Sequence, residues 1–292
     1  MSWRTVCITE PAKLELKLGY LVVRGEVVSR ISLSEINVLI VESTAAAITT
    51  ALLCELSKRK IKIIFCDEKH NPYAELVEYY GSVDTLRRLD EQLCWSRELS
   101  RNIWTAIVKN KITQQAQLLE ERNHRREAGI LDQYISEVQP GDPSNREAHA
   151  AKVYFNALFG VGFSRKDDSA INAALNYGYS FLLSSFNKDI VSRGYLTQLG
   201  LHHRGPFNPF NFSSDLMEPF RPLVDRYVLN SEFEFFLQPE KHKMLEVLNL
   251  VVEINGSQQN LSQAINVYCS SVLRALNNDN LDLIEFYRCI DL

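Results

Sequence analysis

The chain has 292 residues, of which 46% are hydrophobic and 23% charged, so it is long enough for two ordinary domains and too hydrophobic for a disordered protein. Its formal net charge of −4 excludes a protein that coats nucleic acid by bulk electrostatic attraction, but it leaves room for a local basic face. The six cysteines are at least twelve residues apart, which excludes a CxxC pair for zinc or thiol redox chemistry and predicts buried or free thiols.

The N-terminal residues, MSWRTVCITEPAKLEL, lack the apolar segment and the small-residue cleavage site of a signal peptide. No apolar run reaches the roughly 20 residues that a membrane-spanning helix needs. We therefore expect a cytoplasmic protein without a membrane partner.

Residues 3 to 42 alternate short β-branched runs with turn residues, which predicts five strands: RTVCIT, KLELKL, YLVVRG, EVVSRISL and INVLIVE. Residues 44 to 59 change to a helical period, and KIKIIFCD at 60 to 67 returns to a strand pattern. One more short strand, AELVEYY, follows Asn71-Pro72. This order predicts a small antiparallel β domain crossed by one helix.

Gly81-Ser82 breaks the pattern, and from about residue 85 the period is helical. Amphipathic stretches at 85 to 127, 146 to 159, 170 to 187 and 240 to 276 predict a helical bundle. The expected fold class is therefore α+β, with an N-terminal antiparallel β domain at residues 1–80 and a larger all-α domain at residues 81–292.

The first segment with possible chemistry is QPGDPSNREAHAAKVYFNALFG, residues 139 to 160. Asp142-Pro143 opens a helix, and Glu147 is followed by small alanines that leave room for a ligand. The alternative is structural, because Ser144 and Glu147 also form a capping-box pattern.

The second segment is INAALNYGYSFLLSS, residues 171 to 185, an apolar helix with Asn172, Asn176 and Tyr177. The two asparagines share one helix face and are able to meet phosphate oxygens or orient a ligand, or else to bond another helix within the bundle. Gly178 in mid-helix indicates close packing or close approach.

The third segment is LGLHHRGPFNPFNFSSDLMEPFRP, residues 199 to 222. His202 and His203 point in different directions on a regular backbone, so at most one is expected to join a given site. Asp215 and Glu218 share a helix face after the expected cap residues Ser213-Ser214. The alternative is a solvated first turn in which an acid pairs with Arg221.

Together the segments supply carboxylates and one imidazole, a donor set that suits Mn²⁺ or Mg²⁺ better than zinc. Such an ion stabilises charge on a phosphoryl group and orients an attacking oxygen. The most specific function that these residues predict by themselves is metal-dependent chemistry on a phosphodiester.

These segments also carry a resemblance. WRTVCIT, ISLSEINVLIVES, IKIIFCD, REAHAAKVYFNALFG, INAALNYGY, and LGLHH with DLMEPFRPLVD occur in the order found in the CRISPR-associated integrase family, the universal adaptation protein of CRISPR systems, in its type II form. The chain resembles this family almost end to end. The resemblance implies a prokaryotic protein with an N-terminal β domain and a helical catalytic domain.

For the site, the resemblance implies that Glu147, His203 and Glu218 are catalytic and bind the metal ion. Gly200 precedes the histidine by three residues, which selects His203 over His202. Many relatives have aspartate where this chain has Glu218. Asp215 corresponds to a second acid near the ion, and Asn176 and Tyr177 are expected in the surrounding layer. Basic residues near these positions are the expected DNA contacts: Arg146, Lys152, Arg165, Lys166 and Arg204.

The resemblance implies a metal-dependent DNA integrase and endonuclease that joins 3′-hydroxyl ends of short foreign DNA to CRISPR repeats by transesterification. Expected partners are double-stranded DNA, a second copy of the chain bound through the β domain, and a small ferredoxin-like adaptation protein. In type II systems an effector nuclease also takes part, and in some of them a ring-shaped DNA-end-binding protein does. Two alternatives stay open: a standalone metal-dependent nuclease on branched DNA, and a non-catalytic DNA-binding scaffold.

Overall fold

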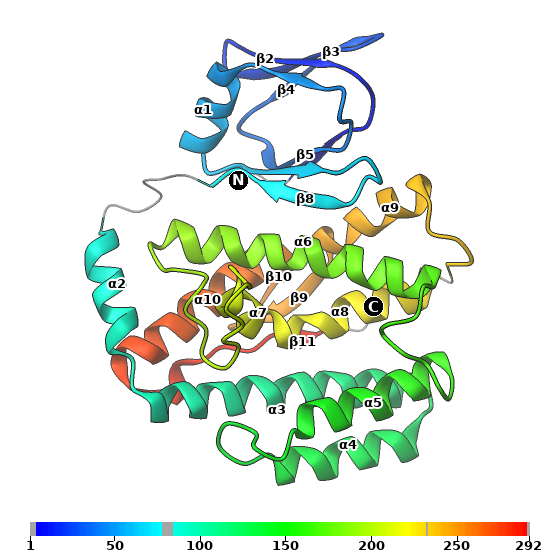
Figure 1. Ribbon diagram of the computed structural model, residues 1–292, viewed down its shortest axis with the longest axis vertical. Coiled ribbons are helices and arrows are strands. Elements are labelled where there is room, and N and C mark those ends of the chain that lie inside the picture. The colour runs from blue at the N-terminus through cyan, green and yellow to red at the C-terminus, as the bar shows by residue number, and fades with distance from the viewer. Residues whose placement is uncertain (1–3, 78–83, 232, 291–292) are drawn as a thin grey trace. The chain divides into compact units, whose positions relative to one another are not determined.

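The computed structural model describes residues 4–77, 84–231 and 233–290. The chain divides into two compact units, Met1–Val83 and Asp84–Leu292 (Figure 1). The break expected at Gly81-Ser82, and with it the boundary after residue 80, lies outside the described residues. Within those ranges, no helix combines the length and apolar character needed to cross a membrane.

The first unit is built mainly of strands, as expected. Its elements are β1 Arg4–Ile8, β2 Lys13–Lys17, β3 Tyr20–Arg24, β4 Val28–Ser32, β5 Ile36–Val41, β6 Ala47–Ile48, α1 Thr50–Lys58, β7 Lys62–Cys66 and β8 Pro72–Glu75. All five strands expected before residue 42 form. The strand expected at AELVEYY, residues 74 to 80, corresponds to β8, which begins and ends earlier in the chain, at Pro72–Glu75. The last three residues of the expected strand, 78 to 80, lie outside the described residues.

The strands of this unit form two sheets, and the expectation of purely antiparallel pairing is wrong. One sheet has the order β4-β3-β2-β6, with β4, β3 and β2 antiparallel. The other has the order β1-β5-β7-β8, in which β5 pairs in parallel with both β1 and β7. For β5 and β7 the cause is connectivity: α1 carries the chain back between them, and such a strand-helix-strand connection produces parallel strands.

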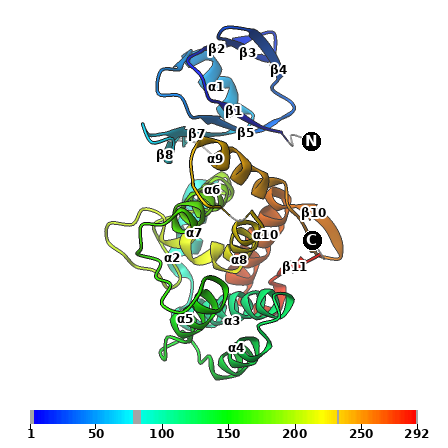
Figure 2. The ribbon, with the colours of Figure 1, turned by 90° about the vertical axis from the view of Figure 1, so that its right-hand side faces the viewer.

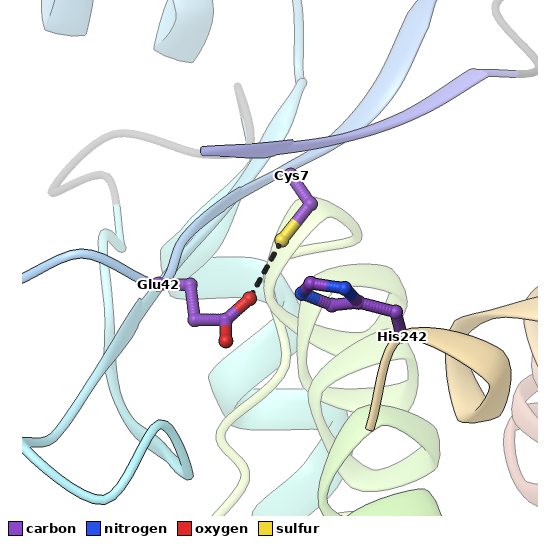
Figure 3. A group of neighbouring side chains, drawn as sticks. All are labelled: Cys7, Glu42 and His242. Carbon is purple, nitrogen blue, oxygen red and sulfur yellow. Dashed lines mark hydrogen bonds between the residues drawn. The ribbon is translucent and has the colours of Figure 1, made fainter. Parts of the chain in front are cut away.

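A single apolar core joins both sheets and α1. Leu14 and Leu21 of one sheet, Leu39 of the other and Leu52 of α1 are all fully buried in it. At its edge the Cys7 thiol donates a hydrogen bond to the fully buried Glu42, with Sγ 3.2 Å from Oε2 (Figure 3). Burial and this carboxylate raise the pKa of Cys7, so the thiol stays protonated. The six cysteines are free thiols, as expected.

The second unit is mostly helical. Its α-helices are α2 Thr85–Cys94, α3 Arg97–Glu121, α4 Arg125–Glu137, α5 Arg146–Phe159, α6 Ala170–Ser192, α7 Asn211–Met217, α8 Arg221–Ser231, α9 Gln238–Met244 and α10 Leu261–Asn278. Short 3₁₀ helices cover Glu218–Phe220 (η1), Leu245–Asn249 (η2) and Leu281–Leu283 (η3). The helices expected at 146 to 159 and 170 to 187 correspond to α5 and to most of α6.

This unit is not all-α, which corrects the expected helix at 240 to 276. Strands β9 Val251–Ile254, β10 Ser257–Asn260 and β11 Arg288–Cys289 form a small antiparallel sheet. The turn between β9 and β10 is Asn255-Gly256, and both residues have positive φ, 51° and 68°. Two such residues define the tight hairpin turn that Asn-Gly favours, so this dipeptide overrides the helical period around it.

Helix α8 lies between α3 and α6 in both views of the ribbon (Figures 1 and 2), and it packs against each of them. Its contact with α6 depends on Gly178. A Cβ atom at Gly178 would lie 2.5 Å from Val224 Cγ1 and 2.8 Å from Met244 Cε. The close packing expected from this mid-helix glycine is therefore present.

We predict that Gly178→Ala lowers the free energy of unfolding by about 1–3 kcal/mol, because α6 must move away from α8 to admit one methyl group. The matched control is Gly129→Ala in α4, where a Cβ atom meets nothing within 4 Å. The control should gain about 0.5–1 kcal/mol from helix propensity. Urea unfolding of both variants measures the two values, and equal effects at the two sites would contradict the packing argument.

Candidate metal centre and catalytic site

Glu147 lies in the first turn of α5, and Asp142 holds this turn in place. The Asp142 carboxylate accepts hydrogen bonds from the backbone amides of Arg146, at 2.9 Å, and Glu147, at 3.0 Å. It thereby satisfies two amides that the start of a helix leaves free. The capping box expected from Ser144 and Glu147 does not form, and the Glu147 side chain is used elsewhere.

Lys111 of α3 lies between Glu147 and Glu218. Its Nζ is 2.6 Å from Oε1 of Glu147 and 2.5 Å from Oε2 of Glu218. Burial by itself would lower the pKa of Lys111, but the carboxylates of Glu218 and Glu147 raise it above the ordinary value. The lysine is therefore a buried cation that joins α3, α5 and the segment that carries Glu218.

Glu218 lies where α7 gives way to the 3₁₀ helix η1. Pro219 and Pro222 follow it, and neither has a backbone N–H for the α-helical pattern. The Arg221 amide bonds instead to the Glu218 carbonyl three residues back. Helix α7 itself begins at Asn211, so Ser213 and Ser214 lie inside the helix and are not its cap, contrary to expectation.

The Glu218 carboxylate is almost fully buried and faces two cations. Oε2 binds Lys111, and Oε1 lies 2.9 Å from Nε of Arg221. Burial by itself would raise the pKa of Glu218, but Arg221 and Lys111 lower it below the ordinary value. Glu218 is thus ionised in the folded protein, as a metal ligand must be.

Asp215, fully buried in α7, organises the turn that carries His203. Its carboxylate accepts hydrogen bonds from the amides of Leu201 (2.6 Å), His202 (3.0 Å) and His203 (3.0 Å). Its Oδ1 is also 2.5 Å from Nδ1 of His203. Because Nδ1 is occupied, Nε2 is the ring nitrogen left to meet a ligand.

Gly200 makes this wrapping possible, because a Cβ atom there would lie 2.7 Å from Oδ2 of Asp215. The rings of the two adjacent histidines make different contacts at this turn. The ring of His203 bonds to Asp215, whereas the ring of His202 stacks in parallel on Trp104, with centroids 4.4 Å apart. The sequence left His202 without a role, and the structure gives it this stacking contact.

Glu147, Glu218 and His203 influence one another electrostatically. The hydrogen bond with Asp215 raises the pKa of His203, and the carboxylates of Glu218 and Glu147 act in the same direction. Their potential ligand atoms do not, however, all lie within 4.8 Å of one another. The ammonium of Lys111 separates the two glutamates, so the three side chains face one region but do not form a closed set of ligands.

A second buried cluster has Asp225 of α8 at its centre. Asp225 accepts hydrogen bonds from the hydroxyl groups of Tyr154, at 3.0 Å, and Tyr179. Burial raises the pKa of Asp225 to about 6, against the opposing effect of these two hydrogen bonds. Tyr154 follows Glu147 by two helical turns on α5, so the cluster supports the helix face that presents Glu147.

The asparagines of α6 hold a neighbouring arginine. Arg165 donates to Oδ1 of Asn172 and, at 2.6 Å, to Oδ1 of Asn176. Asn172 also donates to the carbonyls of Ser164 and Asp167, at 2.8 Å each. Both carbonyl oxygens are taken by Arg165, which lies in the loop between α5 and α6, so these bonds are structural but do not join two helices as the alternative expected.

Tyr177, also expected near the ion, packs in an aromatic group. Its ring centroid is 4.9 Å from that of Phe181 and 5.5 Å from that of Phe236. The neighbouring Tyr179 is the tyrosine of this helix that reaches the buried Asp225. Sequence reasoning gave no functional role to Tyr179, nor to Lys111, Tyr154 and Asp225.

The five basic residues expected at DNA divide into two groups. Arg146 forms an ion pair with Glu137, with Nη2 2.8 Å from Oε2, and Arg165 is held by the asparagines of α6. Lys152, Lys166 and Arg204 are exposed. The exposed group is better suited to phosphate contacts than the two arginines already engaged within the fold.

The family model for "CRISPR associated protein Cas1" matches residues 6–233. A curated relative from Neisseria meningitidis serogroup C, "CRISPR-associated endonuclease Cas1", is 34% identical over 298 residues, covering 100% of this chain and 98% of the relative. The chain therefore belongs to the Cas1 family of CRISPR-associated proteins.

Solved structures agree with this fold. A casposase bound to integration product has a TM-score of 0.76 at 17% identity, covering 96% of this chain and 92% of the casposase. A complex of Cas6-RT-Cas1 with Cas2 gives a TM-score of 0.74 at 17% identity. This chain is 96% covered by that match and spans 36% of that longer chain.

The bond between His203 and Asp215 predicts a pH-dependent stability in metal-free buffer. The folded-state pKa of His203 is raised above its ordinary 6.5, so its charged form stabilises the fold below that value. This contribution is lost as the pH rises through the raised pKa. The measurement is urea unfolding with EDTA between about pH 5 and 9. The free energy of unfolding of the wild type should exceed that of His203→Gln by the largest amount at the acid end of this range.

The control is His202→Gln, which removes an imidazole that stacks on Trp104 in place of bonding to Asp215. The stability difference between the wild type and His202→Gln should not show the same dependence on pH. A difference between wild type and His203→Gln that grows with rising pH would contradict the assigned ion pair.

Proposed function

We propose that this protein is a divalent-metal-dependent DNA integrase and endonuclease of CRISPR adaptation, of the type II branch. Support comes from similarity over the whole chain to a relative named as a CRISPR-associated endonuclease. The observation that carries the chemistry is the Lys111 ammonium between Glu147 and Glu218, because it marks a position where this fold accommodates a cation between two carboxylates.

Glu147, His203 and Glu218 would hold Mg²⁺ or Mn²⁺. Carboxylate oxygens with one imidazole suit these ions, and both carboxylates already face a cation. When bound, such an ion stabilises negative charge on a phosphoryl group and orients an attacking oxygen. The chain's own contribution is positional: Asp215 fixes the His203 ring through Nδ1 and leaves Nε2 free to act.

The proposed reaction is a transesterification. The 3′-hydroxyl of the incoming DNA attacks a phosphorus atom of the CRISPR repeat, and a new phosphodiester forms as the bond from that phosphorus to the repeat's own 3′-oxygen breaks. The proton lost by the attacking hydroxyl is balanced by the one gained by the leaving oxygen. One phosphodiester replaces another, so no nucleotide cofactor is required.

We assign double-stranded DNA as the substrate, with Lys152, Lys166 and Arg204 as its phosphate contacts, since these side chains are exposed on the helical unit. The β unit is assigned to a homodimer interface. A small ferredoxin-like adaptation protein is the proposed partner, together with an effector nuclease and a ring-shaped DNA-end-binding protein. A solved structural relative of this chain is a complex with Cas2.

We predict that Glu147→Ala, His203→Ala and Glu218→Ala each reduce strand joining by at least about a hundredfold, because each removes a group that positions charge at the reacting phosphate. The assay supplies DNA with a 3′-hydroxyl, a repeat-containing plasmid, the adaptation partner and Mn²⁺. Glu120→Ala is the control, since this acid is exposed on α3 and should leave activity unchanged.

Donor DNA that ends in a dideoxynucleotide separates the proposal from a standalone nuclease. An integrase forms a joined product with the 3′-hydroxyl donor but not with the dideoxy donor. A nuclease nicks the plasmid in the presence of either donor and joins neither donor to it. Mn²⁺ binding that survives all three alanine substitutions would favour a non-catalytic scaffold and contradict the proposal.

A further inference from the structure

Lys111 occupies a position on α3 that normally favours an apolar side chain. It follows Trp104 and Ile107 by seven and four residues, and both of these are buried. Lys111 itself is 7% exposed. A buried ammonium costs several kcal/mol of desolvation unless partners offset it. Its carboxylate partners are Glu147 and Glu218, two of the residues proposed to bind the metal ion.

Three of the four oxygens of these glutamates are already used. Oε2 of Glu218 and Oε1 of Glu147 bind Lys111, and Oε1 of Glu218 faces Arg221. A divalent ion takes carboxylate oxygens at about 2.0–2.6 Å. An ion shared by the two oxygens that bind Lys111 would therefore lie where Nζ lies now.

The charges lead to the same conclusion. Two cations, Lys111 and Arg221, balance two carboxylates, Glu147 and Glu218, in a largely buried space. A divalent ion added beside an unmoved Lys111 would leave two positive charges without partners at short range. An exchange, in which the ammonium leaves as the ion enters, avoids this excess.

We propose that Lys111 is an internal competitor of the divalent ion. Its ammonium holds the two glutamates together in the metal-free protein, and the ion displaces it. The inference rests on the proposed metal centre and concerns its regulation. Lys111 is thus a positioning residue that stabilises the empty site at the expense of metal affinity.

The test measures Mn²⁺ binding to the full chain by titration calorimetry at fixed pH and ionic strength. Lys111→Met, which keeps the length and removes the charge, should lower the Kd for Mn²⁺ by roughly tenfold or more, because a unit charge close to a divalent ion is lost. Lys111→Gln should shift the Kd in the same direction and serves if the methionine variant folds poorly. Lys109→Met, two residues away and half-buried, is the matched control and should leave the Kd unchanged.

A second measurement is thermal unfolding in EDTA and in Mn²⁺. Both Lys111 variants should have a lower Tm than the wild type in EDTA, because two carboxylates face each other without their shared cation. Mn²⁺ should then raise the Tm of these variants by more than it raises the wild-type Tm.

The outcomes separate the two proposals. If the wild type binds Mn²⁺, Glu147→Ala abolishes binding, and neither Lys111 variant binds more tightly, the competitor role is overturned and the metal centre stands. If neither the wild type nor the Lys111 variants bind Mn²⁺, both proposals fail. Tighter binding by the Lys111 variants, lost again when Glu147→Ala is added, supports both.

Discussion

The ammonium of Lys111 and the carboxylates of Glu147 and Glu218 form the interaction that most constrains the helical unit. Taking charges out of water costs several kcal/mol for each ion, and the attraction between them offsets this cost only when their geometry is good. The two acids come from segments 36 and 107 residues away from the lysine. Helices α3 and α5 and the turn at Glu218 must therefore pack in one register, since a slip of one helical turn would leave a buried charge alone.

Each proposed ligand also has a neighbour, not itself a proposed ligand, that contacts its side chain or its helix. A carboxylate caps the helix of one glutamate, a guanidinium faces the other, and a buried aspartate bonds the histidine ring. Such outer contacts fix the orientation of a ligand and tune its charge. The three pairs are Asp142 with Glu147, Arg221 with Glu218, and Asp215 with His203.

Much of the fold could be predicted from local patterns. The alternation before residue 42 indicated five strands, and the helical period placed α5 and α6. The parallel direction of β5 and β7 could not be obtained in this way, because it depends on the crossover through α1. The hairpin at Asn255-Gly256 was not predicted although the dipeptide signals it, because the helical period extends across it in the sequence.

The site shows the same division. Residue type and order indicated Glu147, one histidine of the pair and one or two more acids, and the resemblance selected His203 and Glu218 and assigned the roles. Lys111 could not be found from its neighbours in sequence, because a lysine in a helix is usually solvated and its partners are distant along the chain. The place of Asn176 near the ion stays a prediction, and in the structure its carbonyl oxygen accepts a hydrogen bond from Arg165.

The central claim is that one cation position, between Glu147 and Glu218, serves both the lysine and a divalent ion. Anomalous X-ray scattering from a crystal of the protein soaked in Mn²⁺ tests it most directly. The account predicts a single strong peak bound by Glu147, Glu218 and Nε2 of His203, with the Lys111 ammonium moved away from both glutamates. A peak elsewhere in the chain, or none while Lys111 keeps both contacts, would contradict it.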